Sequence, residues 1–369
     1  MMPSPERIAF FISPHGFGHA ARAVAVISAL QIRNPSLHVD LYAQTPSWFF
    51  NESLEGSYEY HELMTDVGLA QINPLEVDLL ETLQRLDAFL PFSDNLIGSL
   101  GQQLKQNCVQ LVVCDISPLG IAVAERAGIP SVLLENFTWD WIYQGYPALN
   151  SSMAIHINTL KTIFAKACFR VQVQPNCSPQ TSDLMTGPVS RTAKMSKQST
   201  RRQLNIPDRK KLVLITMGGI PDVYRSLGPL RKFRDCCFLV PGPNSEIEVN
   251  GNLTLLPYHS KFYHPDLVQA ADVVIGKVGY STLAEVYHAG TPFGYFTRPG
   301  FRESDILSDF VQEKMFGIEL QASEYGDGSW IQHLPDLLDL PVIQRNEVNG
   351  ADSAAVFLND LICQKGTTP

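Results

Sequence analysis

The sequence predicts an α/β protein built from two halves, each with a parallel sheet. Short apolar segments typical of buried strands alternate with longer segments of helical periodicity, which is the pattern of βαβ units. This pattern restarts after a polar segment rich in Ser and Thr at residues 187–210. A chain of 369 residues also exceeds what a single hydrophobic core usually sustains. We therefore expect two domains joined by a linker.

The elements follow from these runs in chain order. In the first half, strands are predicted at residues 7–13, 37–43, 58–63, 109–115, 130–135 and 168–173. Helices are predicted between them at 19–33, 76–106 with a break at Pro91, 118–128 and 149–166. In the second half, strands are expected at 211–219, 236–242, 252–258, 273–277 and 292–296, with helices near 280–290 and 304–315. The expected divisions are residues 1–190, residues 191–349, and a last segment 350–369.

Composition excludes several classes of protein. The net charge of −9 argues against nucleic-acid binding, which needs clustered Lys and Arg. The seven cysteines show no C-x-x-C or other metal-ligand spacing, so we expect reduced thiols and no metal. The N-terminus lacks a signal-type sequence, and no apolar run is long enough to cross a bilayer. These features predict a cytoplasmic protein with no integral membrane segment.

A glycine-rich loop, HGFGHAAR, follows the first predicted strand. The spacing of Gly16, Gly18 and Ala21 fits the G-x-G-x-x-G/A fingerprint of dinucleotide-binding proteins. A nicotinamide site also needs an acidic residue at the end of the second strand, where this chain has Gln44 and Thr45. A dehydrogenase is therefore disfavoured, and the histidines of the loop need another explanation.

A second motif, GKVGYSTLAE, follows a buried strand of the second half. Ser281 and Thr282 open a helix after Lys277 and Gly279, and the first N–H groups of a helix hold phosphate well. Glu285, one turn further on, offers two acceptor oxygens that suit the paired hydroxyls of a ribose. An ordinary helix cap with a solvated Glu285 explains the same residues.

Two loops add to this second motif. Gly218 and Gly219 end the first strand of the second half, where the lack of side chains lets a backbone approach a diphosphate. Arg302 and Glu303 follow a later strand and suit sugar hydroxyls and phosphate, although an ordinary charged turn has the same composition.

These motifs together resemble known sugar transferases. The order Gly218-Gly219, Lys277-x-Gly279-x-x-Thr282-x-x-Glu285 and Gly290-x-Pro292 resembles the nucleotide-sugar half of the peptidoglycan N-acetylglucosaminyltransferase, of glycosyltransferase family 28. That family usually has Arg where this chain has Lys277, which keeps the charge but loses the two-pronged geometry. HGFGHAAR, VVCDISPLGIAVAERAGIPSV and NFTWDWIY resemble the glycosyltransferase-like N-terminal region of L-arabinokinases. No kinase-type phosphate loop follows residue 320, so kinase activity is not implied.

The resemblance implies a GT-B fold, with two Rossmann-like domains facing across a cleft and residues 350–369 crossing back to the first domain. It also implies that the second domain binds a nucleotide diphosphate-sugar, most plausibly UDP-linked, without cofactor or metal, because helix N–H groups and basic side chains stabilise the leaving diphosphate. The residues expected to bind it are Gly218, Gly219, Tyr258, His259, Lys277, Gly279, Ser281, Thr282, Glu285, Arg302 and Glu303.

By the same resemblance, His19 is the expected base that takes a proton from the acceptor hydroxyl, and Asp115 orients it, which favours an inverting mechanism. The alternative is that His19 only bonds the backbone or a substrate phosphate. Arg22 either meets an acceptor anion or pairs with Asp115. The residues expected on the acceptor or sugar side are Gly16, Gly18, Arg22, Trp139 and Asp140, with core packing as the alternative for Trp139.

The function expected from these residues is a glycosyltransferase that moves a sugar from a nucleotide diphosphate-sugar to an acceptor that the sequence does not identify. Two alternatives keep the same fold: a nucleotide-sugar 2-epimerase, which needs no acceptor, and a nucleotide-sugar-binding protein without catalysis. The sequence indicates no particular oligomeric state.

Overall fold

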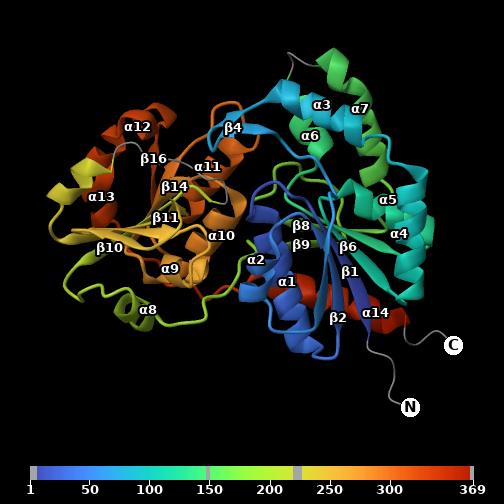
Figure 1. The fold of residues 1–369 in the computed structure, drawn as a ribbon, viewed down its shortest axis with the longest axis horizontal. Coiled ribbons are helices and arrows are strands. Elements are labelled where there is room, and N and C mark those ends of the chain that lie inside the picture. The colour runs from blue at the N-terminus through green and yellow to red at the C-terminus, as the bar shows by residue number, and fades with distance from the viewer. Residues whose placement is uncertain (1–5, 147–149, 219–226, 366–369) are drawn as a thin grey trace. The chain divides into compact units, whose positions relative to one another are not determined.

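Two compact α/β units make up the chain (Figure 1). The computed structural model describes residues 6–146, 150–218 and 227–365, so Gly219 of the predicted site lies outside the described residues. The first unit comprises Met1–Ala70, Asp78–Ser190 and Val348–Pro369, and the second comprises Gln71–Val77 and Arg191–Glu347. The short segment Gln71–Val77 thus groups with the second unit, which the sequence did not indicate.

The first unit is built on a seven-stranded parallel sheet in the order β3-β2-β1-β6-β7-β8-β9. Its strands are β1 (Arg7–Ile12), β2 (His38–Ala43), β3 (Tyr58–Glu62), β6 (Leu111–Asp115), β7 (Ser131–Glu135), β8 (Phe169–Val173) and β9 (Leu184–Thr186). The order reverses between β1 and β6, and such a switch point is where open α/β sheets bind ligands.

Helices cover both faces of this sheet. They are α1 (Gly18–Arg33), α2 (Ser47–Ser53), α3 (Leu79–Phe89), α4 (Asp94–Gln106), α5 (Pro118–Ala127), α6 (Trp139–Gln144), α7 (Asn150–Phe164) and α14 (Gly350–Lys365). The last helix, α14, packs beside α1 over one face (Figure 1). Helix α5 lies on the other face, where a Cβ at Gly120 would come within 2.6 Å of Phe11, so only glycine allows this close approach.

The second unit repeats the plan in the order β12-β13-β11-β10-β14-β15-β16, parallel except for the antiparallel pair β12–β13. Its strands are β10 (Lys211–Thr216), β11 (Cys236–Asn244), β12 (Glu248–Asn250), β13 (Leu253–Pro257), β14 (Val273–Lys277), β15 (Phe293–Phe296) and β16 (Gly317–Leu320), with a separate hairpin of β4 (Gln71–Asn73) and β5 (Glu76–Val77). Here the order reverses between β10 and β14.

Two apolar clusters sandwich this second sheet. Its helices are α8 (Lys197–Gln203), α9 (His264–Ala270), α10 (Tyr280–Ala289), α11 (Ser304–Lys314), α12 (Ala322–Asp327) and α13 (Leu334–Asp339), with the 3-10 turns η2 (Gly228–Lys232) and η3 (Ser329–His333). Helices α9, α10 and α11 supply residues to one cluster, and α13 and η3 supply residues to the other.

The predicted fold class is confirmed, while some elements differ from the sequence prediction. Residues 76 and 77 form a strand instead of starting a helix, because β5 pairs with β4. The segment 187–210 is not a bare linker, since it contains α8. Arg201 on that helix is buried and pairs with Asp272 at 3.0 Å, so its charge is neutralised inside the fold rather than solvated.

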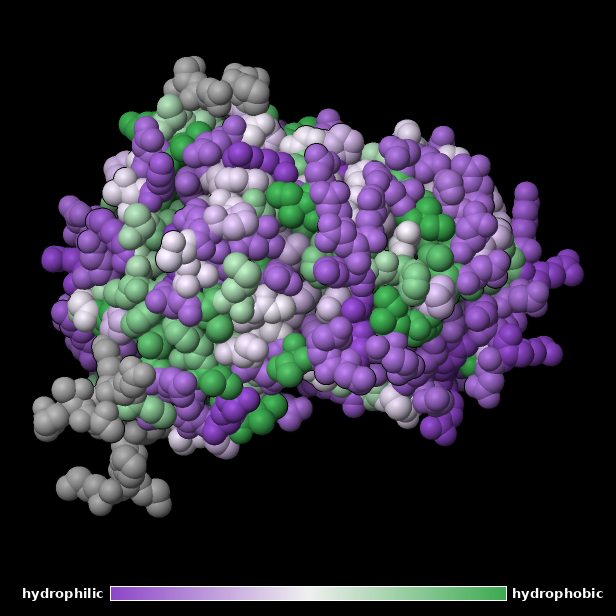
Figure 2. All heavy atoms as spheres, turned by 180° about the vertical axis from the view of Figure 1, so that it is seen from behind, coloured by the Kyte–Doolittle hydropathy of each residue, from purple (hydrophilic) through white to green (hydrophobic). Residues whose placement is uncertain are grey.

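The surface seen in Figure 2 carries apolar side chains in patches between polar ones. Within the described ranges, no helix combines the length and the apolar character needed to cross a membrane.

Candidate functional site

The first candidate site lies at the switch point of the first sheet. His19 is in the first turn of α1, which follows β1, and Asp115 is the last residue of β6. Gly16 takes a positive φ of 67° in the loop between β1 and α1, a conformation that favours glycine. The short βα loop and the adjacent strand end thus bring together two residues 96 positions apart in the chain.

The imidazole and the carboxylate form a close, buried pair. His19 Nδ1 lies 2.7 Å from Asp115 Oδ1, and Asp115 is fully buried. An ionised carboxylate can only accept hydrogen bonds, so Nδ1 carries the proton and donates it. In the neutral ring the lone pair then belongs to Nε2. This arrangement fixes one tautomer of His19, as in catalytic His–Asp pairs.

Arg22 completes the cluster one turn along α1. Its Nε and Nη2 donate to the two oxygens of Asp115 at 2.7 and 2.6 Å, and Nη1 donates to Asn136 Oδ1. Burial opposes charge on Asp115, but the Arg22 guanidinium and the His19 hydrogen bond outweigh it and hold the pKa of the carboxyl below its usual value. Of the two roles considered for Arg22, the ion pair with Asp115 is the one present in the structure.

A second buried acid, which sequence reasoning missed, lies under the same loop. Asp66 Oδ2 accepts from Ser13 Oγ at 2.9 Å, and Oδ1 accepts from the Val67 N–H at 2.7 Å. Burial raises the pKa of Asp66 to about 7, although these hydrogen bonds favour its ionised form. His15 Nδ1 accepts from the Leu69 N–H at 3.3 Å, so the segment after Asp66 contacts the loop that carries His15.

Trp139 has the surroundings expected from the core-packing alternative. Its ring is 1% exposed and packs against His15, Phe137 and Tyr143 with centroids 5.3, 5.2 and 6.0 Å apart. Protein surrounds the ring, so it belongs to the core instead of offering a face to a sugar. Asp140, the next residue, is half-buried, and its Oδ1 has no hydrogen-bond partner among the described residues. Gly16 and Gly18 are half-buried at the start of α1.

The second candidate site lies at the switch point of the second sheet, where β10 and β14 end. A Cβ at Gly276 would meet the Thr216 carbonyl oxygen at 2.1 Å, so glycine is required for these strands to approach. Gly218 has a positive φ of 73°, and a Cβ there would lie 3.3 Å from Lys277 Cε. The lysine side chain therefore runs along the loop that follows β10.

Glu285 lies beside this loop, on α10, and is buried. Its Oε1 accepts from Arg191 Nε at 3.0 Å, and its Oε2 accepts from His264 Nδ1 at 2.7 Å. Burial disfavours its charge, but Arg191 and His264 outweigh burial and lower the pKa of the carboxyl. His264 Nε2 lies 3.3 Å from Thr216 Oγ1, which ties the cluster to the end of β10. Glu285 is thus not a solvated surface residue, and its ribose contact stays a prediction.

Basic and acidic side chains gather at the ends of β14 and β15. Arg298 Nη2 donates to Glu303 Oε1 at 2.7 Å, and both residues are buried. Burial of the Lys277 ammonium, reinforced by the like charge of Arg298, lowers its pKa to about 7. Arg298 Nε and Glu303 Oε2 have no hydrogen-bond partner among the described residues.

The remaining predicted residues are spread around this edge. Gly279 is the N-cap of α10 and Ser281 and Thr282 lie in its first turn, with no side chain capping the helix. Tyr258 and His259 follow β13 and are exposed, as is Arg302 after β15. The nucleotide-binding roles of all these residues stay predictions.

Sequence reasoning missed four members of the two sites: Asn136, Arg191, His264 and Asp66. Asn136 opens the NFTWDWIY motif, whereas Asp66, Arg191 and His264 lie in none of the motifs described above. The available signal was position, because Asn136 directly follows the strand β7 and Arg191 lies in the segment that joins the two halves.

No family profile matches the chain. It is 27% identical over 358 residues to L-arabinokinase from Arabidopsis thaliana, which covers 95% of this chain but only 34% of the relative, so the chain spans about a third of that protein.

Solved structures resemble the whole chain. MurG from Acinetobacter baumannii superposes with a TM-score of 0.55 at 16% identity, covering 98% of this chain and all of that one. The kitacinnamycin glycosyltransferase gives 0.59 at 14% identity, covering 99% and 96%. A UDP-glucosyltransferase from Polygonum tinctorium that glucosylates indoxyl gives 0.62 at 13% identity, covering 98% and 99%. The chain therefore has the GT-B fold that its sequence motifs implied.

Proposed function

We propose that this chain is an inverting, metal-independent glycosyltransferase that uses a UDP-linked sugar. The observation that carries the proposal is the buried Asp115 carboxylate that holds His19 Nδ1 at 2.7 Å. A carboxylate that fixes the tautomer of a histidine at a sheet switch point suits a general base. Several solved structures with the same fold are glycosyltransferases by name, which supports the same reaction class.

In the proposed reaction, His19 Nε2 accepts the proton of the acceptor hydroxyl as that oxygen attacks the anomeric carbon. The new carbon–oxygen bond forms while the bond to the diphosphate breaks, and the nucleoside diphosphate leaves with the electron pair. Asp115 stabilises the imidazolium that results. Arg22 keeps Asp115 ionised throughout, because its guanidinium contacts both carboxylate oxygens.

The second unit would bind the nucleotide-sugar. The first turn of α10 supplies N–H groups and the positive end of the helix dipole, which suit a diphosphate. Lys277 adds positive charge that adjusts to the ligand, because its pKa of about 7 rises when an anion binds nearby. Glu285, held by Arg191 and His264, would accept from the ribose hydroxyls with its remaining lone pairs.

The test is a thermal-shift screen of the full chain with UDP-, dTDP-, GDP- and ADP-sugars, followed by turnover with the best ligand. A ligand at 100 times its Kd should stabilise the fold by about 2.7 kcal/mol. Turnover is measured as nucleoside diphosphate released in the presence of candidate acceptor alcohols, with the anomeric configuration of the product read by NMR.

Each outcome of this screen has a distinct meaning. Acceptor-dependent release with inverted configuration is the expected result. An epimerised sugar formed without acceptor identifies an epimerase, and tight binding without turnover identifies a binding protein. Failure of all four nucleotide classes to stabilise the chain contradicts the proposal.

A further inference from the structure

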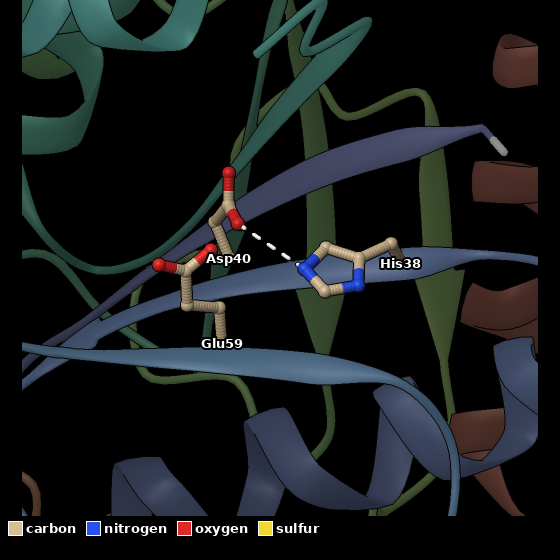
Figure 3. Close-up of side chains that lie close together, drawn as sticks. All are labelled: His38, Asp40 and Glu59. Carbon is tan, nitrogen blue, oxygen red and sulfur yellow. Dashed lines mark ion pairs between the residues drawn. The ribbon is translucent and has the colours of Figure 1, made fainter. Parts of the chain in front are cut away.

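A second cluster of ionisable side chains lies in the first unit, away from the switch point (Figure 3). His38 and Asp40 alternate along β2, and Glu59 and His61 alternate along β3. Asp40 pairs with Glu59 across the two parallel strands, and alternate residues of a strand share a face of the sheet. Two imidazoles and two carboxylates therefore lie on one face near the sheet edge. Arg7, at the start of β1, also contacts this cluster.

Three of these side chains, His38, Asp40 and Glu59, are spaced as in a metal site, and His61 lies outside this group of three. One ligand atom from each of His38, Asp40 and Glu59 lies within 4.8 Å of the others. His38 Nε2 is 3.6 Å and His61 Nε2 is 3.9 Å from Asp40 Oδ1, and His61 Nε2 is also 3.9 Å from Glu59 Oε1. These contacts are too long for hydrogen bonds. They approach the separation of about 3.4 Å between ligands that a tetrahedral zinc ion requires at about 2.1 Å from each.

Polar atoms without partners point to a ligand here. Among the described residues, the buried His38 Nε2, His61 Nε2 and Tyr42 hydroxyl make no hydrogen bond. Tyr42 is 1% exposed and its ring stacks on His61 with centroids 4.6 Å apart. Buried polar groups normally make hydrogen bonds, so these three atoms need an explanation. His38 Nδ1, in contrast, contacts Ser57 Oγ at 2.7 Å, the kind of contact that orients a metal-binding imidazole.

Arg7 supplies the positive charge at this point of the structure. Its Nη2 lies 2.5 Å from Asp40 Oδ1 and 2.7 Å from Glu59 Oε2, so a cation is already stabilised between the two carboxylates. The Arg7 side chain is partly exposed, at 22%, and Glu59 is 54% exposed. Both side chains can therefore rearrange toward solvent, while Asp40 cannot because it is fully buried.

We propose that His38, Asp40, Glu59 and His61 form a site for a divalent transition-metal ion of the zinc class, which displaces the Arg7 guanidinium. Two imidazoles and two carboxylates suit Zn²⁺ better than Mg²⁺ or Ca²⁺, which prefer oxygen ligands. Arg7 competes with the ion for the same carboxylates, so occupancy depends on metal concentration. The ligands join β2 to β3 at the edge of the sheet, so the ion stabilises this edge and takes no part in sugar transfer.

This proposal differs from the sequence prediction of no metal. Spacing along the chain could not reveal the site. The ligands come from two strands about 20 residues apart, and only the parallel register of β2 and β3 brings them together. The proposal does not depend on the proposed glycosyltransferase function, since its readout is metal binding itself.

The experiment is a titration of the tag-free, chelator-dialysed full chain with Co²⁺, followed by visible absorption. The expected result is one Co²⁺ per chain with the intense visible bands of tetrahedral coordination, bleached when Zn²⁺ displaces it. His61→Ala and His38→Ala should each weaken binding at least about tenfold. His333→Ala is the matched control, because it removes a histidine paired with Glu324 at 2.9 Å in the other unit and should leave binding unchanged.

A second variant tests the competition with Arg7. Arg7→Met removes the competing charge and should bind Co²⁺ at least about tenfold more tightly than the wild type. Zn²⁺ should then raise its melting temperature more than that of the wild type. The proposal is overturned if the wild type shows no tetrahedral bands, or if His61→Ala and His333→Ala bind Co²⁺ equally well. In either case Arg7 is the permanent counter-ion of Asp40.

Discussion

The two switch-point sites contain the same three kinds of side chain in different arrangements. In the first unit, Asp115 accepts from Arg22 with both oxygens and from His19 with one. In the second unit, Glu285 accepts from Arg191 with one oxygen and from His264 with the other. Both carboxyls have a lowered pKa despite burial, because an arginine lies in contact with each.

The two histidines have different proposed roles. Nδ1 is held by the carboxylate in both sites, and His264 Nε2 also lies 3.3 Å from Thr216 Oγ1. His264 thus links Glu285 to the end of β10. We interpret His19 as the group that moves a proton and His264 as a positioning residue.

The largest expected effect is the loss of turnover in His19→Ala. Removing a general base should lower kcat by about 10² to 10⁴-fold. The thermal shift caused by the nucleotide-sugar should stay as in the wild type, because that ligand is assigned to the second unit. Stopped assays of nucleoside diphosphate release measure the first quantity. A variant that keeps wild-type turnover would remove the distinction between the two histidines.

The second-largest expected effect is a rise in KM for the nucleotide-sugar in Glu285→Gln. Glu285→Gln removes the negative charge between Arg191 and His264 and weakens the contact with ribose, so KM for the nucleotide-sugar should rise about 10- to 100-fold with a smaller change in kcat. Leaving Arg191 without its buried counter-ion should also cost about 3 kcal/mol or more of stability.

The matched control for Glu285→Gln is Glu324→Gln. Glu324 also pairs with a histidine, His333, but does so near the surface, where ion pairs contribute little. We expect its KM and unfolding free energy to stay near the wild-type values. If the two glutamine variants behave alike in steady-state kinetics, Glu285 has no role in binding the nucleotide-sugar.

The sequence predicted the fold class and the proximity of His19 to Asp115, because both follow from local patterns. The alternation of apolar strands and helices implied parallel sheets, and strand ends placed His19, Asp115 and Glu285 near switch points. Their supporting residues were not predictable in the same way. His264 reaches Glu285 from 21 residues away, through packing that no motif records, and Asn136, which opens the NFTWDWIY motif, reaches Arg22 from 114 residues away.

Trp139 shows a choice that the sequence could not make. The aromatic run after β7 suited either a sugar-stacking surface or core packing, and the ring is buried against other aromatic side chains. Large aromatic side chains contribute so much to core packing that composition alone does not separate a core from a binding surface. Composition could not reveal the proposed metal site either, because the register of β2 and β3 decides which residues are neighbours across the strands.

The smallest expected effect is a pH dependence of nucleotide-sugar affinity at the second site. Lys277 has a pKa of about 7, so it loses its charge as pH rises from 6 to 8.5 and attracts a diphosphate less. Nucleotide-sugar affinity, measured by calorimetry, should fall roughly threefold to tenfold over this range.

The unfolding free energy should change in the opposite direction. The unfolded chain keeps the ordinary lysine pKa of 10.5, so it binds more protons than the folded chain between pH 7 and 10.5. The unfolding free energy therefore rises with pH in that window. Lys277→Met should abolish both slopes, and Lys277→Arg should bind tightly at every pH, since arginine stays charged. If Lys277→Met keeps the wild-type slope in affinity, the titrating group lies elsewhere and Lys277 does not contact the diphosphate.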